Sequence, residues 1–89
     1  MDVLEAKIFA AQLNSDIPTL DLHGAYINEA LDKLELFLFE NYNRREEKIV
    51  KIIYGGGTGK LGVEVCSYLD KHVLVTQVIK EFGSCLAVL

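Results

Sequence analysis

The chain has 89 residues, enough for one domain with a single hydrophobic core and too few for two. Its composition, 51% hydrophobic and 25% charged, is typical of a folded chain and not of a disordered one. The net charge of −4 argues against a sequence-independent nucleic-acid clamp, because such binding depends on many Lys and Arg contacts with phosphates.

No apolar run approaches the roughly 18 residues needed to cross a bilayer, so we expect no membrane partner. Cys66 and Cys85 have neither the spacing of a CxxC motif nor that of a metal site. With no signal peptide in view, we expect reduced thiols and a cytoplasmic protein.

Three elements are predicted in the first half of the chain. Residues 2–13 have a wide apolar face, which predicts a helix that packs on the domain or on another chain. A short strand is predicted over residues 19–22, and the clearest helix over residues 26–42. Leu36 and Phe39 lie off the apolar stripe of that helix. We expect the N-terminal helix to cover them; the alternative is a homodimer or protein-partner surface.

The second half is predicted to continue with a strand over residues 50–53, a glycine turn over residues 55–59 and a helix over residues 60–71 that Thr58 caps. Strands follow over residues 73–82 and 85–89. We divide the chain into an N-terminal helix with its lead-in, residues 1–18, and a domain, residues 19–89.

This order predicts an α/β fold of the α+β two-layer kind, β-α-β-α-β-β, with a mixed four-stranded sheet and an extra N-terminal helix. Its two strand–helix–strand crossovers favour a largely parallel sheet, to which the final hairpin adds an antiparallel edge.

The glycine turn is the clearest candidate for a binding site. Glycines allow positive φ and close approach of a ligand, and the N-terminus of the next helix attracts anions. This pattern predicts phosphate binding; the alternative is a tight connection with no ligand. The residues are Gly55, Gly56, Gly57, Thr58, Gly59 and Lys60. NTP hydrolysis is not expected, because Tyr54 and Leu61 stand where a P-loop has its first glycine and its hydroxyl.

Asp21 and His23 are the candidate catalytic residues. They share one side of the first strand, and His23 follows its end, so we expect it at the same sheet edge as the glycine turn. Asp21 would hold the imidazole in one tautomer while the other nitrogen acts as general acid or base. The alternative is a surface histidine without chemical role. No metal ligand set is found, and whether a divalent ion is used stays open.

Together the two motifs resemble the small MutS-related (Smr) domain family. Leu20-Asp21-Leu22-His23-Gly24 resembles its first motif, and residues 55–61 match its pattern Gly-x-Gly-Thr-Gly-x-Leu. The resemblance covers residues 19–89. It implies a β-α-β-α-β-β fold and binding or endonucleolytic cleavage of DNA or RNA. It also implies that Asp21 and His23 are the catalytic pair and that Gly55, Gly57 and Gly59 shape the backbone turn.

Two positions depart from the family pattern. Tyr54 stands where many members have His, and Gly62 stands where the bacterial pattern usually has Arg. A guanidinium there would neutralise charge that develops on a scissile phosphate. An endonuclease is therefore the leading hypothesis, and a catalytically weakened interaction module is the alternative. A third hypothesis is a sensor of small anions or nucleotides.

Overall fold

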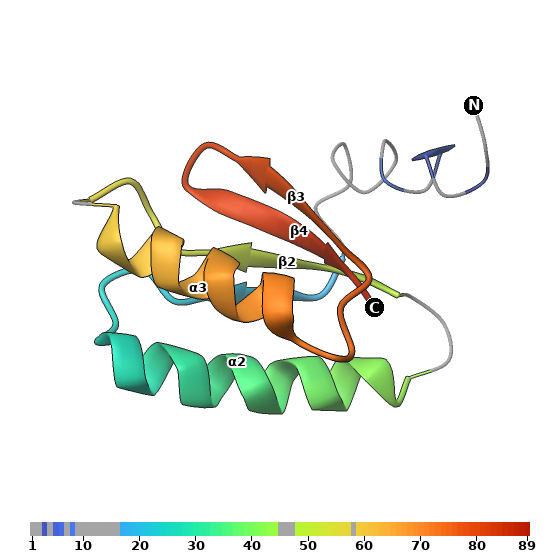
Figure 1. Cartoon of the computed structure of the whole chain (residues 1–89), viewed down its shortest axis with the longest axis horizontal. Coiled ribbons are helices and arrows are strands. Elements are labelled where there is room, and N and C mark those ends of the chain that lie inside the picture. Colours follow the sequence, from blue (N-terminus) through green and yellow to red (C-terminus); the bar gives the residue numbers. More distant parts are fainter. Residues whose placement is uncertain (1–2, 4, 7, 9–16, 45–47, 58) are drawn as a thin grey trace.

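The computed structural model describes residues 3, 5, 6, 8, 17–44, 48–57 and 59–89. Within these residues it contains two helices and four strands in the predicted order β-α-β-α-β-β (Figure 1). Their bounds are β1 Thr19–Asp21, α2 Ile27–Tyr42, β2 Ile49–Ile53, α3 Lys60–Lys71, β3 Gln77–Glu81 and β4 Ser84–Val88. The predicted α+β class is confirmed.

The four strands form one mixed sheet in the order β1-β2-β4-β3. β1 pairs with β2 in parallel, whereas β4 is antiparallel to both of its neighbours. The final hairpin therefore adds an antiparallel edge, as predicted, with β3 as the edge strand and β4 inside the sheet. All five residues of β4 are buried. Its apolar run, without polar alternation, is typical of a strand covered on both faces.

Both helices pack on the same face of the sheet (Figure 1). The buried apolar residues of α2, which are Ala30, Leu34 and Leu38, recur every four positions and so form one stripe toward the strands. This main core contains Leu22, Ala30, Leu34, Leu38, Val50, Ile52, Val65, Leu69, Cys85 and Ala87. Burial of these side chains fixes α2 and α3 side by side over the sheet.

The opposite face of the sheet carries a smaller cluster. It is formed by Ile17, Ile49, Leu86 and Val88, with Ile8 and Ile79 partly buried against it. The helix predicted over residues 2–13 lies mainly outside the described residues, but Ile8 is thus on the face away from α2. Leu36 and Phe39 are 60% and 57% exposed. The expectation that the N-terminal helix covers them is therefore wrong.

Two predicted boundaries also differ from the structure. β3 is shorter than the strand predicted over residues 73–82, because the Val75 N–H donates to the His72 carbonyl (3.1 Å) and the chain turns there. The N-cap of α3 is Gly59, with φ 84°, and not the predicted Thr58, which lies outside the described residues. In the part of the chain that the structure describes, no helix is long and apolar enough to span a membrane.

Candidate functional site

The candidate site lies at the sheet edge where the parallel strands β1 and β2 both end. After β1 the chain enters the loop that carries His23, and after β2 it enters the glycine turn. The starts of α2 and α3 and the turn between β3 and β4 lie at this same end of the molecule, at the left of Figure 1. Two motifs distant in sequence are thus brought to one edge.

His23 contacts the first glycine of the turn. A Cβ atom built on Gly55 would lie 2.5 Å from His23 Cδ2 and 3.5 Å from Cγ and Nε2. Gly55 also has a φ of 80°, which favours glycine. Its N–H donates to the Gly83 carbonyl (2.9 Å) and is therefore not directed at a ligand. Gly55 thus leaves room for the imidazole, and its N–H is used within the fold.

Asp21 holds the backbone of the His23 loop. Its Oδ1 accepts a hydrogen bond from the His23 N–H at 2.9 Å, as in an Asx turn. The Leu22 N–H donates to the Ile53 carbonyl (2.7 Å), which fastens the same loop to β2. The sequence predicted that Asp21 orients the imidazole itself. The bond observed here instead fixes the peptide that carries the imidazole.

The other residues of the predicted phosphate site lead into α3. Around Gly57 and Gly59 nothing lies within 4 Å of an added Cβ, so the turn is open there. Lys60 is exposed and begins α3, whose first N–H groups and positive dipole end point toward this opening. A hollow of about 360 Å³ lies beside it, lined by Ala25, Tyr26, Ile27, Asn28, Lys60 and Leu61. Thr58 is outside the described residues.

The two departures from the Smr pattern contact each other. A Cβ atom on Gly62 would lie 2.8 Å from Cε1 and 2.9 Å from Cδ1 of Tyr54, so the tyrosine ring fits only because residue 62 has no side chain. The Tyr54 hydroxyl donates to the Ser84 carbonyl (2.8 Å), and Cys66 Sγ lies 3.6 Å from it. Burial, and then the bond with Cys66, raise the pKa of Tyr54.

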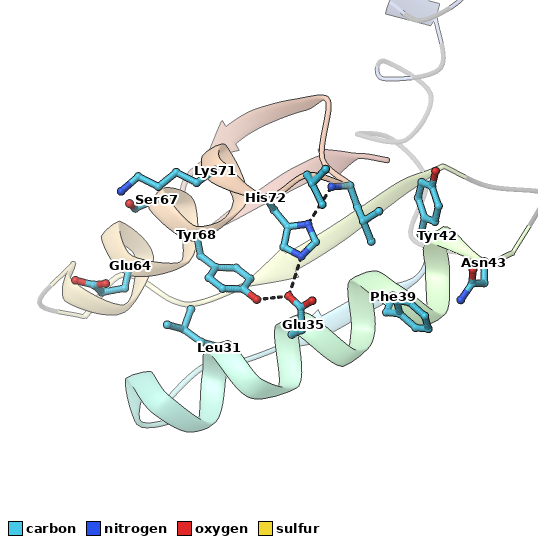
Figure 2. A pocket seen from close by; sticks show the side chains of 12 residues that line it. Leu31, Glu35, Phe39, Tyr42, Asn43, Glu64, Ser67, Tyr68, Lys71 and His72 are labelled. Carbon is cyan, nitrogen blue, oxygen red and sulfur yellow. Dashed lines mark hydrogen bonds and ion pairs between the residues drawn. The ribbon is translucent and has the colours of Figure 1, made fainter.

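A second hollow, of about 700 Å³, lies between α2 and α3 and contains none of the predicted site residues (Figure 2). In it the Glu35 carboxylate accepts hydrogen bonds from the Tyr68 hydroxyl and from His72 Nε2, the latter at 2.7 Å. The Leu74 N–H donates to His72 Nδ1 (3.0 Å), so the imidazole proton is on Nε2. Both ring nitrogens are used within the fold. We therefore assign this network the role of joining α2 to α3.

The ionisation of this network follows from its bonds. The hydrogen bond from Tyr68, followed by that from His72, lowers the pKa of Glu35. Burial, and then the same bond, raises the pKa of Tyr68 to about 12. The sequence alone does not reveal this contact, because Glu35 and His72 are 37 positions apart and no motif links them. Among the described residues, no group of three or more His, Cys, Asp or Glu side chains is placed to hold a metal ion.

Comparison with known proteins decides the family. The model of the Smr domain family matches residues 20–84. The chain belongs to the Smr domain family. Smr domains bind nucleic acid and include nuclease-type domains. A comparison with curated proteins finds no match.

The fold of this Smr domain is also that of a solved structure. The crystal structure of the Smr domain of Thermus thermophilus MutS2 superposes with a TM-score of 0.73 and 20% sequence identity. The similarity covers 81% of this chain and 96% of that chain. At this identity the likeness establishes the fold alone. The chemistry of this Smr domain must be argued from its own residues.

Proposed function

We propose that this Smr domain binds nucleic acid at the edge formed by His23 and the glycine turn, and that it cleaves phosphodiester bonds there as an endonuclease. One observation carries the proposal: the His23 imidazole lies on Gly55, at the entrance to a turn that opens onto the start of α3. A group able to transfer protons thus stands beside a group of donors suited to a phosphate.

The residues of the site have different roles in the proposed cleavage. His23 removes a proton from the attacking oxygen or supplies one to the leaving oxygen, and Asp21 positions it through its backbone N–H. The backbone from Gly56 to the start of α3, together with Lys60, stabilises the negative charge that grows on the phosphate. Lys60 acts as a point charge and not as a bidentate fork, so its stabilisation depends less on orientation.

The test is cleavage of supercoiled plasmid and of structured RNA by the purified chain, each with Mg²⁺ and with EDTA. We expect cleavage by the native chain and its loss in His23→Ala. The matched control is His72→Gln, which changes the other histidine of the chain, in the groove between α2 and α3. Cleavage that is unchanged in His23→Ala would remove the proposed role of His23.

A second candidate function is a catalytically weakened module that binds without cleaving. It is favoured by the contact between Tyr54 and Gly62, which leaves no side chain at position 62 to face a scissile phosphate. On this hypothesis the native chain does not cleave, and its binding falls steeply with salt and with Lys60→Ala. Gly62→Arg alone would collide with Tyr54. The informative variant is therefore Tyr54→His combined with Gly62→Arg, which should gain cleavage.

A protein partner or a second copy of the chain is proposed to bind at Leu36 and Phe39, because both are more than half exposed on α2. The measurement is the mass of the native chain and of Phe39→Glu by size-exclusion chromatography with light scattering. An equal monomer mass for both would argue against a homodimer through this patch.

We also propose a cytoplasmic location, since Cys66 and Cys85 are free and buried thiols.

A further inference from the structure

An exposed aromatic ring lies beside the glycine turn. Phe82 is 97% exposed and lies in the turn between β3 and β4. Its ring lies near the glycine turn, since Cζ is 3.8 Å from the position that a Cβ on Gly56 would occupy. The two turns are also joined through their backbones: the N–H groups of Tyr54 and Gly55 both donate to the Gly83 carbonyl, at 3.0 and 2.9 Å. The backbone turn that carries Phe82 is thus bonded to the glycine turn, while its ring is open to solvent.

A second exposed ring lies near the start of α3. Tyr26 is 80% exposed, precedes α2 and lines the hollow of about 360 Å³ together with Lys60. Lys80 of β3 lines another hollow, of about 500 Å³, that extends to Gly59. Two exposed aromatic rings, Tyr26 and Phe82, and the lysines Lys60 and Lys80 therefore lie around the glycine turn and the start of α3.

We infer that the site takes single-stranded nucleic acid, with unpaired bases stacked on Phe82 and Tyr26 while a phosphate between them lies on the glycine turn. The inference rests on the proposed function and adds the substrate class. Aromatic side chains stack on bases that are free of their neighbours, whereas the base faces of a duplex are already stacked. A duplex would leave both rings without a partner.

The charge of the chain favours the same substrate. Duplex binding is dominated by the release of counterions from many phosphates, which lysine and arginine side chains displace. A chain with a net charge of −4 can displace few of these counterions. Stacking does not depend on net charge, so it adds affinity where the lysines are few. Exposure alone would prove nothing, since isolated exposed apolar residues are common on protein surfaces. Phe82 differs because it lies near the glycine turn and because the turn that carries it is bonded to that turn.

The experiment measures binding by fluorescence anisotropy. The probes are labelled single-stranded oligothymidine, single-stranded oligouridine and a blunt DNA duplex of equal length, each at two salt concentrations. The variants are Phe82→Leu, which keeps an apolar side chain without a ring, Phe82→Tyr, which keeps the ring, and Tyr26→Leu. Val73→Ala is the control, because Val73 is 92% exposed and follows α3 at its other end.

We expect single strands to bind more tightly than the duplex, and Phe82→Leu to weaken single-strand binding about tenfold. Phe82→Tyr should restore it, and Val73→Ala should not change it. Because Phe82 is exposed, its substitution should leave the melting temperature unchanged. Single-strand binding that is equal in Phe82→Leu and the native chain, or tighter binding of the duplex, would overturn this inference alone. Absence of binding to every probe would overturn the proposed function as well.

Discussion

The imidazole of His23 lies so close to the Cα of Gly55 that no side chain fits at position 55. The two residues come from motifs that follow different strands, yet each constrains the other. Gly55 must stay a glycine for His23 to keep its place, and Asp21 holds the peptide from which that imidazole extends. The first motif and the glycine turn therefore act as one structural unit.

Gly55→Ala should destabilise the domain more than Gly24→Ala. Both glycines have similar φ values, 80° and 77°, so both substitutions cost roughly 1–2 kcal/mol for the backbone conformation. Only at position 55 would the new Cβ collide with His23, since nothing lies within 4 Å at position 24. Urea unfolding of both variants measures the difference. In a His23→Ala background the difference should vanish, and its persistence there would show that the collision is not its cause.

Gly62→Ala should change the free energy of unfolding with opposite sign in two backgrounds. In the native chain the new Cβ would lie 2.8 Å from the Tyr54 ring, which is held by its bond to Ser84, so we expect a loss of stability. In a Tyr54→Ala background the ring is absent, and alanine should stabilise α3 by about 1 kcal/mol relative to glycine. Urea unfolding of the four chains forms a double-mutant cycle. The same sign in both backgrounds would contradict the prediction.

The network between α2 and α3 should lose its contribution in acid. The folded-state pKa of Glu35 is below its ordinary value of 4.5, so the ionised group stabilises the fold above that pH. This contribution is lost as the pH falls through the lowered pKa. Because Glu35 is half exposed, we expect only a few tenths of a kcal/mol. Unfolding of the native chain and of Glu35→Gln should differ near pH 6 and converge toward pH 3. A difference that grows in acid would refute the assignment.

The two thiols should react slowly while the domain is folded. Cys85 is fully buried, and burial raises its pKa to about 12, which leaves little of the reactive thiolate. Cys66 is buried as well, against the Tyr54 hydroxyl. We expect slow labelling by an aromatic disulfide reagent in buffer and rapid labelling of both thiols in concentrated urea. Cys66→Ser and Cys85→Ser report the two sites separately. Rapid reaction of Cys85 in buffer would contradict its place in the core.

The sequence predicts where helices and strands lie better than it predicts which of them are neighbours in the fold. Local periodicity is enough to place α2 and α3, because their apolar stripes are complete within each segment. The place of β4 in the sheet depends on which strands pair, and no local pattern states that. Its uninterrupted apolar run does carry a signal for a central strand. The cover expected for Leu36 and Phe39 failed for the same reason, since a surplus of apolar residues does not identify its partner.

Some features of the candidate site could be predicted from the sequence, and others could not. That His23 and the glycine turn share an edge follows from the ends of two parallel strands, so it could be predicted. The bond from Asp21 to the His23 backbone and the use of the Gly55 N–H by Gly83 could not, because they depend on loop geometry. Tyr54 follows β2, and Gly62 lies in α3. Their fit therefore cannot be predicted from the apolar periodicity of the strand or of the helix.

The inner position of β4 has a consequence for how the domain is made. β2 and β3 do not pair with each other. β3 is bonded to the sheet only through β4, whereas β2 pairs with both β1 and β4. On the ribosome, β3 thus emerges with no strand to join until residues 84–88 have followed it. Most of the sheet then closes only once β4 is available, so cooperative folding should wait for residues 84–88, and chains truncated before residue 84 should be targets for proteolysis.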